Sequence, residues 1–576
     1  MTDLKTGPSG LGNAPRENYK YDGNGLVTLN DVFGDLGKLI RDYSVEGLDG
    51  RFWTDKLLRH ILSRERIKAE LKRPEHGFND LEVDGYVDKI HPPDVKPSAD
   101  RTPPGAFLKV FGLLVLQERC GDIRRFVNAE FNDQQLPIRV ENNTVYPLAG
   151  PDLPIACFEG WRTSEKEYFE SHQWKIDTPY FSSVADEPLK KHHLHKSACK
   201  PWRRSRETSF EPRNDDSDNM IAFGRVTRVE IHPTSHAYPH LLKSTLHRIN
   251  HNNESKFQEE WEMLKRFNGL KHPHLVTALC AFCCADERGF IFPGAICDLG
   301  EYLEKSEPPR HSKATIWISD QLLGLIGALQ TIHNPEHVEQ GVGSGYGRHG
   351  DIKSDNILCF KRLGDKGEII LVISDFGLST FNSVKSRSNI PNHKVLPIPG
   401  YCPPECHIEG GTISRAFDIW TLGCLFLDQI TWFLGGPRYV EDFDQARTTM
   451  FINGANNNIF FAFKRRPDKE SYTVQVKTEV VEWIIKLHQH PDCSKFLHDA
   501  LDIISREMLV VIAQGRNRSS SGKLLDAFRM LSSKCTRKEE YVIGDPWTGK
   551  KAKKAKDLIR KNNIAVDAMP IQSRRL

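Results

Sequence analysis

The chain has 576 residues, too many for one ordinary hydrophobic core, so two or three domains are expected. An apolar fraction of 39% and a net charge of +3 exclude a wholly disordered chain and provide no global attraction to nucleic acid or membranes. Thirteen scattered cysteines, an N-terminus without an apolar signal segment and no apolar run near the roughly 20 residues of a membrane span favour a cytoplasmic or nuclear protein with reduced thiols.

The N-terminal third is predicted to be mainly helical. Residues 1–30 are rich in glycine, asparagine and charge, and we expect them to form a disordered tail. Residues 31–198 follow as a mainly helical region, because leucines and isoleucines recur there at steps of three and four residues. The run AFLKVFGLLVL, over 106–116, is too short for a membrane span and predicts a buried helix. No chemistry is evident in this region, so its role and its protein partner stay open.

Strands precede helices in the remainder of the chain. Residues 223–232 are rich in β-branched side chains and predict a strand. Residues 255–267 predict a helix, since Ser255 and Gln258 have capping-box spacing. A longer helix is predicted over 318–332, where apolar residues keep helical spacing. This order indicates an α+β arrangement, with a small β-rich lobe followed by a larger helical lobe.

Two short segments supply the groups that phosphoryl transfer requires. In HGDIKSDN, Asp351 can accept the proton of an attacking hydroxyl, Lys353 can neutralise charge on the transferring group and Asn356 can bind a metal ion. In LVISDFG, Asp375 directly follows an apolar strand and can chelate magnesium. Each motif alone is weak, but their order and separation together are specific. A purely structural role explains them poorly, because burying an unpaired charge costs several kcal/mol.

These motifs resemble those of the protein kinase family. HGDIKSDN is similar to its catalytic loop and DFG to its magnesium loop, while YCPPE and DIWTLGC resemble two further motifs of the large lobe. The resemblance covers residues 199–540 and implies the bilobal protein-kinase fold, with a small lobe over 199–295 and a large lobe over 296–540. It implies ATP and Mg²⁺ as cofactors and protein hydroxyls as substrates. More narrowly, YGRHGDIKSDNIL, ISDFGLSTF and ISRAFDIWTLGCL resemble kinase-like proteins of filamentous fungi that carry a helical N-terminal region.

The resemblance also implies roles for individual residues. It gives the catalytic and metal-binding roles derived above to the following four residues: Asp351, Lys353, Asn356 and Asp375. Lys353 also favours specificity for serine and threonine over tyrosine. Glu405 would form an ion pair with Arg518 that braces the substrate platform. Asp418 would fix the backbone of the catalytic loop.

The glycine-rich loop of the small lobe is incomplete. The family pattern is G-x-G-x-x-G-x-V. Setting Gly224 and Val226 on its end places Asn219 and Ile221 where the earlier glycines belong. A side chain at Ile221 would hinder the approach of backbone N–H groups to phosphates. We therefore expect nucleotide binding to be weakened rather than abolished.

The phosphate-binding lysine has two candidate positions. In the frame TLHRI, similar to the family's A-x-K-R-I, the lysine position holds His247, and the partner glutamate is best matched by Glu260. Lys243 lies four residues earlier, about 13 Å along a strand at about 3.3 Å per residue, so it substitutes only if the strand shifts in register. Losing one preorganised charged donor costs on the order of 10² to 10³ in rate. The expectation is a slow serine/threonine kinase; the alternative is a pseudokinase scaffold with weak or no nucleotide binding.

Two glycines replace functional residues of the large lobe. Gly350 stands where the family has the arginine that clamps a phosphorylated activation loop. We therefore expect activity that does not depend on activation-loop phosphorylation. Gly400 stands where serine/threonine kinases usually carry a threonine.

The C-terminal segment, 541–576, is predicted to be a basic tail. It contains GKKAKKAKDLIRK, which fits a nuclear address or a patch for nucleic acid or acidic membranes, against the alternative of a solvated segment. Nucleic acid is otherwise not expected as a partner. Elsewhere, LCAFCC around Cys280 and KKHHLHKSAC around His193 contain metal-ligand residue types. The first has no paired second cluster, so a buried strand is favoured over a zinc site. The second has no evident acidic partner, so metal binding is not favoured there.

Overall fold

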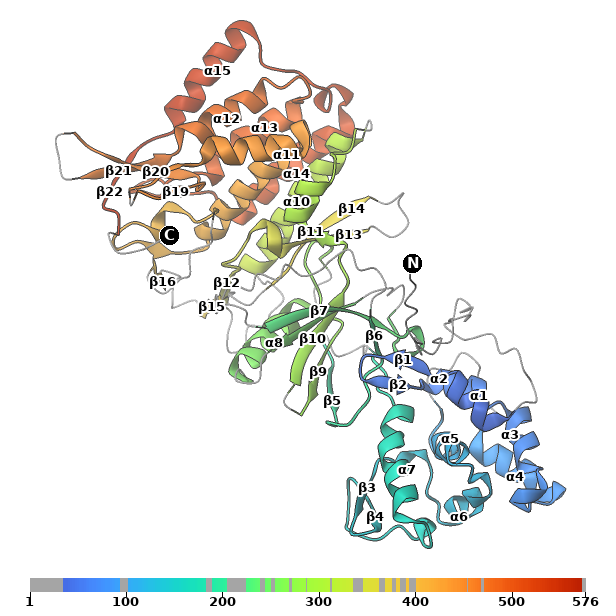
Figure 1. The fold of residues 1–576 in the computed structure, drawn as a ribbon. Coiled ribbons are helices and arrows are strands. Elements are labelled where there is room, and N and C mark those ends of the chain that lie inside the picture. Colours follow the sequence, from blue (N-terminus) through green and yellow to red (C-terminus); the bar gives the residue numbers. More distant parts are fainter. Residues whose placement is uncertain are drawn as a thin grey trace, which may run out of the picture. The chain divides into compact units, whose positions relative to one another are not determined.

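The structure is a computed structural model. It describes residues 35–571 except for 94–101, 183–188, 205–223, 239–243, 250–253, 269–271, 286, 311–312, 335–344, 362–367, 376–379, 384–389, 393–399, 453 and 468–470. The predicted disordered tail over 1–30 lies outside the described residues. The chain divides into two compact units. Figure 1 labels their helices and strands. The first takes in Met1–Glu211, Gly224–His251 and Leu279–Ile291, and the second takes in Pro212–Phe223, Asn252–Ala278 and Phe292–Leu576.

Short helices form most of the N-terminal part of the first unit. They are α1 (Leu36–Asp42), α2 (Asp55–Ile61), α3 (Arg64–Leu71), α4 (Asp80–Ile90), α5 (Leu108–Leu116), α6 (Ile123–Asn128) and α7 (Thr163–Ile176). Small hairpins accompany them, made by β1 (Val45–Gly47) with β2 (Gly50–Phe52) and by β3 (Ile138–Glu141) with β4 (Thr144–Pro147). The predicted helical content is confirmed, and the hairpins are an addition that the sequence did not indicate.

Helix α5 is the centre of this region. Apart from Lys109 its side chains are buried, which confirms the predicted buried helix. The Lys109 ammonium group lies 2.6 Å from the Asp177 carboxylate, so the one charge on the helix is paired. The Asp133 carboxylate accepts hydrogen bonds from the backbone amides of Lys109 and Val110, and it thereby satisfies two donors at the start of the helix.

A mixed sheet forms the remainder of the first unit. Among the described residues, its strands lie in the order β5-β9-β10-β8-β7-β6. They are β5 (Lys191–Leu194), β6 (Trp202–Arg204), β7 (Gly224–Ile231), β8 (Ser244–Ile249), β9 (Cys280–Cys284) and β10 (Glu287–Pro293). The predicted strand over 223–232 is confirmed as β7, and the cysteine-rich run is a strand, β9. Because β5 pairs in parallel with β9, the sheet includes residues that precede position 199.

The second unit is mainly helical. Its helices are α8 (Glu254–Asn268), α9 (Leu299–Lys305), α10 (Ala314–His333), α11 (Ala416–Arg447), α12 (Thr478–His488), α13 (Lys495–Ile503), α14 (Ser521–Arg537) and α15 (Gly549–Asn562). The predictions of helices over 255–267 and 318–332 are confirmed as α8 and α10. Helix α10 packs along α14 (Figure 1). Helix α11 bends where Gly436 adopts a φ of 74° before Pro437.

Short strands connect these helices. They are β11 (Cys297–Asp298), β12 (Gly345–Arg348), β13 (Ile357–Lys361), β14 (Ile369–Ile373), β15 (Thr380–Ser383), β16 (Ile390–Pro391), β17 (Thr412–Ile413), β18 (Thr449–Met450), β19 (Asn456–Asn457), β20 (Phe461–Arg465), β21 (Tyr472–Val476) and β22 (Val566–Ala568). The pairs β12–β15 and β13–β14 flank the residues that carry the candidate chemistry.

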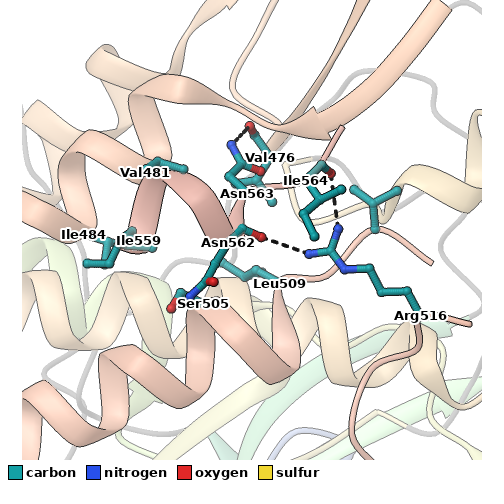
Figure 2. Close-up of a pocket in the computed structure, with 11 residues that line it drawn as sticks. Val476, Val481, Ile484, Ser505, Leu509, Arg516, Ile559, Asn562, Asn563 and Ile564 are labelled. Carbon is teal, nitrogen blue, oxygen red and sulfur yellow. Dashed lines mark hydrogen bonds between the residues drawn. The ribbon is translucent and has the colours of Figure 1, made fainter. Parts of the chain in front are cut away.

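The described part of the predicted basic tail, residues 541–571, contains α15 and β22 and is folded rather than a solvated segment. Strand β22 pairs with β21, and Ile559 of α15 is only 4% exposed. Arg516 donates hydrogen bonds to the backbone carbonyls of Asn562 and Ile564, at 3.1 and 3.2 Å (Figure 2). The apolar face of α15 is therefore buried, although lysines such as Lys553 remain exposed. Among the described residues, no helix combines the length and the apolar character needed to cross a membrane.

Truncating Ile559 to alanine should destabilise the second unit by about 2–4 kcal/mol, because it removes a buried aliphatic side chain. The matched control is Leu558→Ala, since the neighbouring Leu558 is 46% exposed. That variant should change stability by no more than about 0.5 kcal/mol. Urea unfolding followed by tryptophan fluorescence measures both. Equal midpoints for the two variants would contradict the packing of α15.

Candidate active site

Three of the predicted residues converge on one loop. The loop follows β12 and includes η6 (Ser354–Asn356), a single 3-10 turn. The Asn356 side-chain nitrogen donates to the backbone carbonyl of Asp351 at 2.8 Å and to its Oδ2 at 2.7 Å. The Lys353 Nζ lies 3.3 Å from the same Oδ2. The Asp351 carboxylate is thus held in one place beside a positive charge, and its side chain is 13% exposed.

A fully buried carboxylate holds the backbone of this loop. The two oxygens of Asp418 accept hydrogen bonds from the amides of His349 and Gly350, at 2.8 and 2.9 Å. The His333 Nε2 lies 2.9 Å from Asp418 Oδ2. Burial alone would raise the pKa of Asp418, but the hydrogen bond and charge of His333, the charge of His349 and the Gly350 amide hold it below its ordinary value. The carboxylate therefore stays ionised where it is needed to accept these bonds.

A second set of hydrogen bonds links Ser374, the residue before Asp375, to the loop. Strands β13 and β14 pair so that Ile357 is opposite Ile373. Just beyond this pair, the amide and hydroxyl of Ser374 donate to the carbonyl of Asn356, at 2.9 and 3.0 Å. Asp375 comes next, exposed and with a φ of 61°. This left-handed conformation is uncommon for a residue other than glycine.

The donor atoms here suit a magnesium ion. The Asn356 amide nitrogen is directed at Asp351, so the amide oxygen is the atom left to bind a cation. The Asp375 side chain is an exposed carboxylate one residue from the Asn356–Ser374 hydrogen bonds. Amide and carboxylate oxygens are hard ligands of the kind that Mg²⁺ prefers. Asn356 and Asp375 therefore fit the metal role that the sequence predicts.

Some of the candidate residues of the small lobe lie outside the described residues. Gly224 is the first residue of β7, and Val226 lies opposite His247 in the β7–β8 ladder. Lys243, together with the predicted loop positions Asn219 and Ile221, lies outside the described residues. Glu260 belongs to α8 and to the second compact unit, whereas His247 belongs to the first. The structure thus assembles the large-lobe residues and leaves the choice between His247 and Lys243 as a prediction.

The predicted Glu405–Arg518 ion pair is present and buried. Two nitrogens of Arg518 donate to the two oxygens of Glu405, at 2.6 and 2.9 Å. Arg518 also donates to the backbone carbonyls of Val510 and Ala416. A bidentate pair of this kind fixes geometry as well as charge. It connects the segment after Gly400 to the start of α11 and to the loop before α14.

A second buried network beside this segment was missed by the sequence analysis. The Tyr401 hydroxyl donates to Asp428 at 2.6 Å, and Arg447 donates to the other oxygen of Asp428 at 2.8 Å. Burial and then the nearby Asp428 charge raise the pKa of Tyr401 well above its ordinary value, so it remains a donor. The available signal was the single acid in the apolar run CLFLDQI, since a buried charge requires a partner. This network fixes the residue that directly follows Gly400.

Replacing Asp418 by asparagine should loosen the catalytic loop. The amide offers one oxygen in place of two, so at least one of the three donors, the His349 and Gly350 amides and His333 Nε2, loses its acceptor. Each lost hydrogen bond should cost the loop about 1–3 kcal/mol of stability. The amides of His349 and Gly350 should then exchange hydrogen roughly 10-fold to 100-fold faster, as measured by mass spectrometry. Asp526→Asn on α14, where the side chain is exposed, is the control. Unchanged protection in Asp418→Asn would show that this carboxylate does not hold the loop.

Comparison with known proteins agrees with this geometry. Residues 222–504 match the family model described as a protein kinase domain. A receptor-like protein kinase of Arabidopsis thaliana is 29% identical over 169 residues, which cover 28% of this chain and 32% of that protein. Cyclin-dependent kinase 2 of Caenorhabditis elegans is 29% identical over 157 residues, covering 27% and 38%. Cyclin-dependent kinase 14 of Homo sapiens is 26% identical over 189 residues, covering 33% and 36%.

The chain spans about a third of the length of these relatives. The match begins just before β7 and includes the catalytic loop, Asp375 and all of α11. It ends before Arg518, inside the wider range of 199–540 that the sequence indicated. Motifs, hydrogen-bonded geometry and family match all point to the same region, and residues 222–504 are a protein kinase domain.

Proposed function

We propose that the chain is a serine/threonine protein kinase that transfers the γ-phosphate of ATP to hydroxyl groups of protein substrates. The observation that carries the proposal is the convergence of Asn356 and Lys353 on the Asp351 carboxylate, at 2.7 and 3.3 Å. The Asp351 carboxylate and the Lys353 ammonium group are both partly exposed, and a purely structural role does not account for this pair. They are the groups needed at a phosphoryl acceptor.

In this proposal Asp351 orients the substrate hydroxyl and accepts its proton. Asn356 and Lys353 both engage Oδ2, so Oδ1 is the atom that would meet the hydroxyl. The Lys353 ammonium group, which is 30% exposed, would turn toward the transferring phosphoryl group and offset its charge. Magnesium, when bound by Asn356 and Asp375, would neutralise the phosphate oxygens. Catalysis would then rest on positioning and electrostatics rather than on covalent chemistry.

The backbone at Gly400 bears on how Lys353 is placed. Gly400 has a φ of 77°, a left-handed conformation that a β-branched residue adopts only with strain. The usual threonine of serine/threonine kinases is therefore poorly suited to this position. Lys353 Nζ contacts the Asp351 carboxylate directly, at 3.3 Å, so these two side chains need no threonine between them. Serine/threonine specificity thus rests on Lys353 in this chain.

The geometry at Gly350 supports activity without activation-loop phosphorylation. Gly350 has a φ of 82°, and its amide is bound to Asp418. An arginine side chain at this position would require the same left-handed backbone. Arg348, two residues earlier, is buried, with its guanidinium 5.9 Å from the centre of the Phe417 ring. Its burial makes it a poor receptor for a phosphate group.

A pseudokinase that acts as a scaffold is the second candidate function. It is favoured by the sequence frame that sets His247 at the position expected of the phosphate-binding lysine, and His247 pairs with Val226 in the β7–β8 register. A histidine there would hold phosphate weakly at neutral pH, since its reference pKa is about 6.5. The two candidate functions therefore differ in whether nucleotide binding is sufficient for turnover.

A thermal shift with Mg²⁺ and ATP, combined with phosphotransfer to a generic protein substrate, distinguishes these functions. The wild type should show a shift and slow turnover. Asp375→Asn should lose on the order of 10² to 10³ in rate, because it removes a preorganised metal ligand. Asp355→Asn, in the same loop but exposed, should change neither readout. A wild type with neither shift nor turnover would favour the scaffold.

The phosphate-binding position is tested by three variants. His247→Lys should raise turnover by on the order of 10² to 10³, because it restores the missing charged donor. His247→Ala should lower turnover, and Lys243→Ala should leave it close to that of the wild type. Phosphotransfer at saturating substrate measures all three. Loss of turnover only in Lys243→Ala would show that Lys243 occupies the position.

A further inference from the structure

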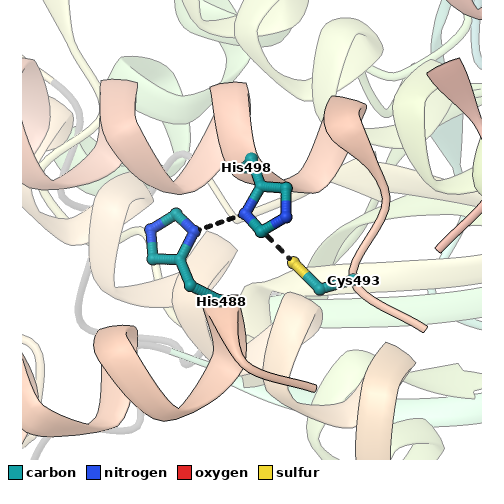
Figure 3. A group of neighbouring side chains, drawn as sticks. All are labelled: His488, Cys493 and His498. Atoms are coloured by element: carbon teal, nitrogen blue, oxygen red, sulfur yellow. Dashed lines mark hydrogen bonds between the residues drawn. The ribbon is translucent and has the colours of Figure 1, made fainter. Parts of the chain in front are cut away.

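Three buried potential metal ligands meet at the turn between α12 and α13. His488 is the last residue of α12, Cys493 lies in the turn and His498 is in the first half of α13. Their ligand atoms all lie within 4.8 Å of one another, and all three side chains are buried (Figure 3). The cluster belongs to the large lobe and takes no part in the proposed phosphoryl transfer.

Hydrogen-bond geometry assigns the proton on His498. Its Nε2 lies 2.8 Å from the backbone carbonyl of Asp545, and a carbonyl oxygen only accepts, so Nε2 carries the hydrogen. In the neutral ring, Nδ1 then carries a lone pair. This single lone pair faces two groups, His488 Nδ1 at 2.6 Å and Cys493 Sγ at 3.6 Å. It cannot accept a good hydrogen bond from both, so the arrangement is better suited to a shared electrophile.

We propose that His488 Nδ1, Cys493 Sγ and His498 Nδ1 bind one zinc ion, with water at the fourth position. Tetrahedral zinc separates a thiolate sulfur from an imidazole nitrogen by about 3.6 Å and two imidazole nitrogens by about 3.3 Å. The first separation matches the observed 3.6 Å between Cys493 and His498. The second requires the two rings to move apart by about 0.7 Å from the observed 2.6 Å. A thiolate with two imidazoles is a ligand set that favours zinc over magnesium or calcium.

The groups around the cluster resemble the outer shell of a metal site. The second nitrogen of His498 is oriented by the Asp545 carbonyl, and His488 Nε2 lies 4.0 Å from an Asp502 carboxylate oxygen. Metal-bound histidines commonly donate their other N–H to such groups. On binding, Cys493 would release its thiol proton to solvent, and the His488 hydrogen would move from Nδ1 to Nε2, facing Asp502.

The same cluster is attached to the segment that leads into α15. The Trp547 ring stacks on His488 with 3.7 Å between centroids, and its amide donates to the His488 carbonyl. The Asp545 amide donates to the Cys493 carbonyl at 2.9 Å. A side chain at Gly544 would meet the Pro491 carbonyl at 2.3 Å, so the close approach of this segment requires glycine. The proposed ion would therefore fasten this segment to α12 and α13.

A second group of potential ligands, Glu70, His76 and Cys120 in the first unit, is a weaker candidate. The Glu70 carboxylate is already engaged by His76 at 3.0 Å and by the Arg73 guanidinium at 3.2 Å. The positive charge of Arg73 opposes a cation there. Cys120 consequently provides a control for zinc bound elsewhere in the chain.

Zinc content of the purified full-length chain, measured by inductively coupled plasma mass spectrometry, tests the proposal. The wild type, Cys120→Ser and Cys535→Ser should each retain one zinc ion per chain; Cys535 is a buried cysteine of α14. Cys493→Ser should lose it. A chelator should lower the melting temperature of the wild type and leave that of Cys493→Ser unchanged. A zinc-free wild type, or equal zinc in Cys493→Ser, overturns the proposal.

Cobalt substitution decides the question even if Cys493→Ser does not fold. Cobalt added to the chelator-treated wild type should give a thiolate-to-metal charge-transfer band and the visible bands of tetrahedral coordination. These bands should persist in Cys120→Ser, which excludes the other group. Absence of the charge-transfer band in the wild type, or its loss in Cys120→Ser, overturns the proposal.

Discussion

The candidate active site depends on one buried ionised carboxylate. Asp418 accepts two backbone amides of the catalytic loop and lies within hydrogen-bonding distance of His333. It therefore ties the first turn of α11 and the last turn of α10 to the residue that precedes Asp351. A buried charge is tolerated only when it is paired and hydrogen-bonded. Here the hydrogen bonds that compensate the buried charge of Asp418 are the same ones that position Asp351. The contacts that stabilise the loop therefore also set its geometry.

The large lobe is more complete than the small lobe. Asp351, Lys353 and Asn356 are mutually positioned, and Asp375 follows a residue bonded to Asn356. By contrast, His247 lies in register with Val226 in the small lobe, and the predicted frame keeps only one glycine of the expected loop. Because phosphoryl transfer relies on positioned charge, the predicted deficit of one charged donor would lower the rate without removing the proposed mechanism. This balance leads to a slow kinase as the favoured function.

Sequence reasoning succeeded where local pattern and function coincide. The helical spacing of α10 and the β-branched run of β7 follow from local patterns, whereas the Glu405–Arg518 pair follows from the resemblance to the protein kinase family. Asp428 was missed because its partners, Tyr401 and Arg447, are distant in sequence and only the fold brings them to it. The lysine-rich α15 was predicted as a tail because two buried positions among many charges are a weak periodic signal. The proposed zinc ligands His488, Cys493 and His498 follow no common metal motif, and their proximity is visible only in three dimensions.

The most direct test of the proposed chemistry is a crystal structure of the chain with Mn²⁺ and a non-hydrolysable ATP analogue. We expect an anomalous manganese peak about 2.1 Å from both the Asn356 amide oxygen and the Asp375 carboxylate, beside the phosphates. Nucleotide bound without metal at these two residues, or no nucleotide at saturating concentration, would contradict the proposed kinase mechanism.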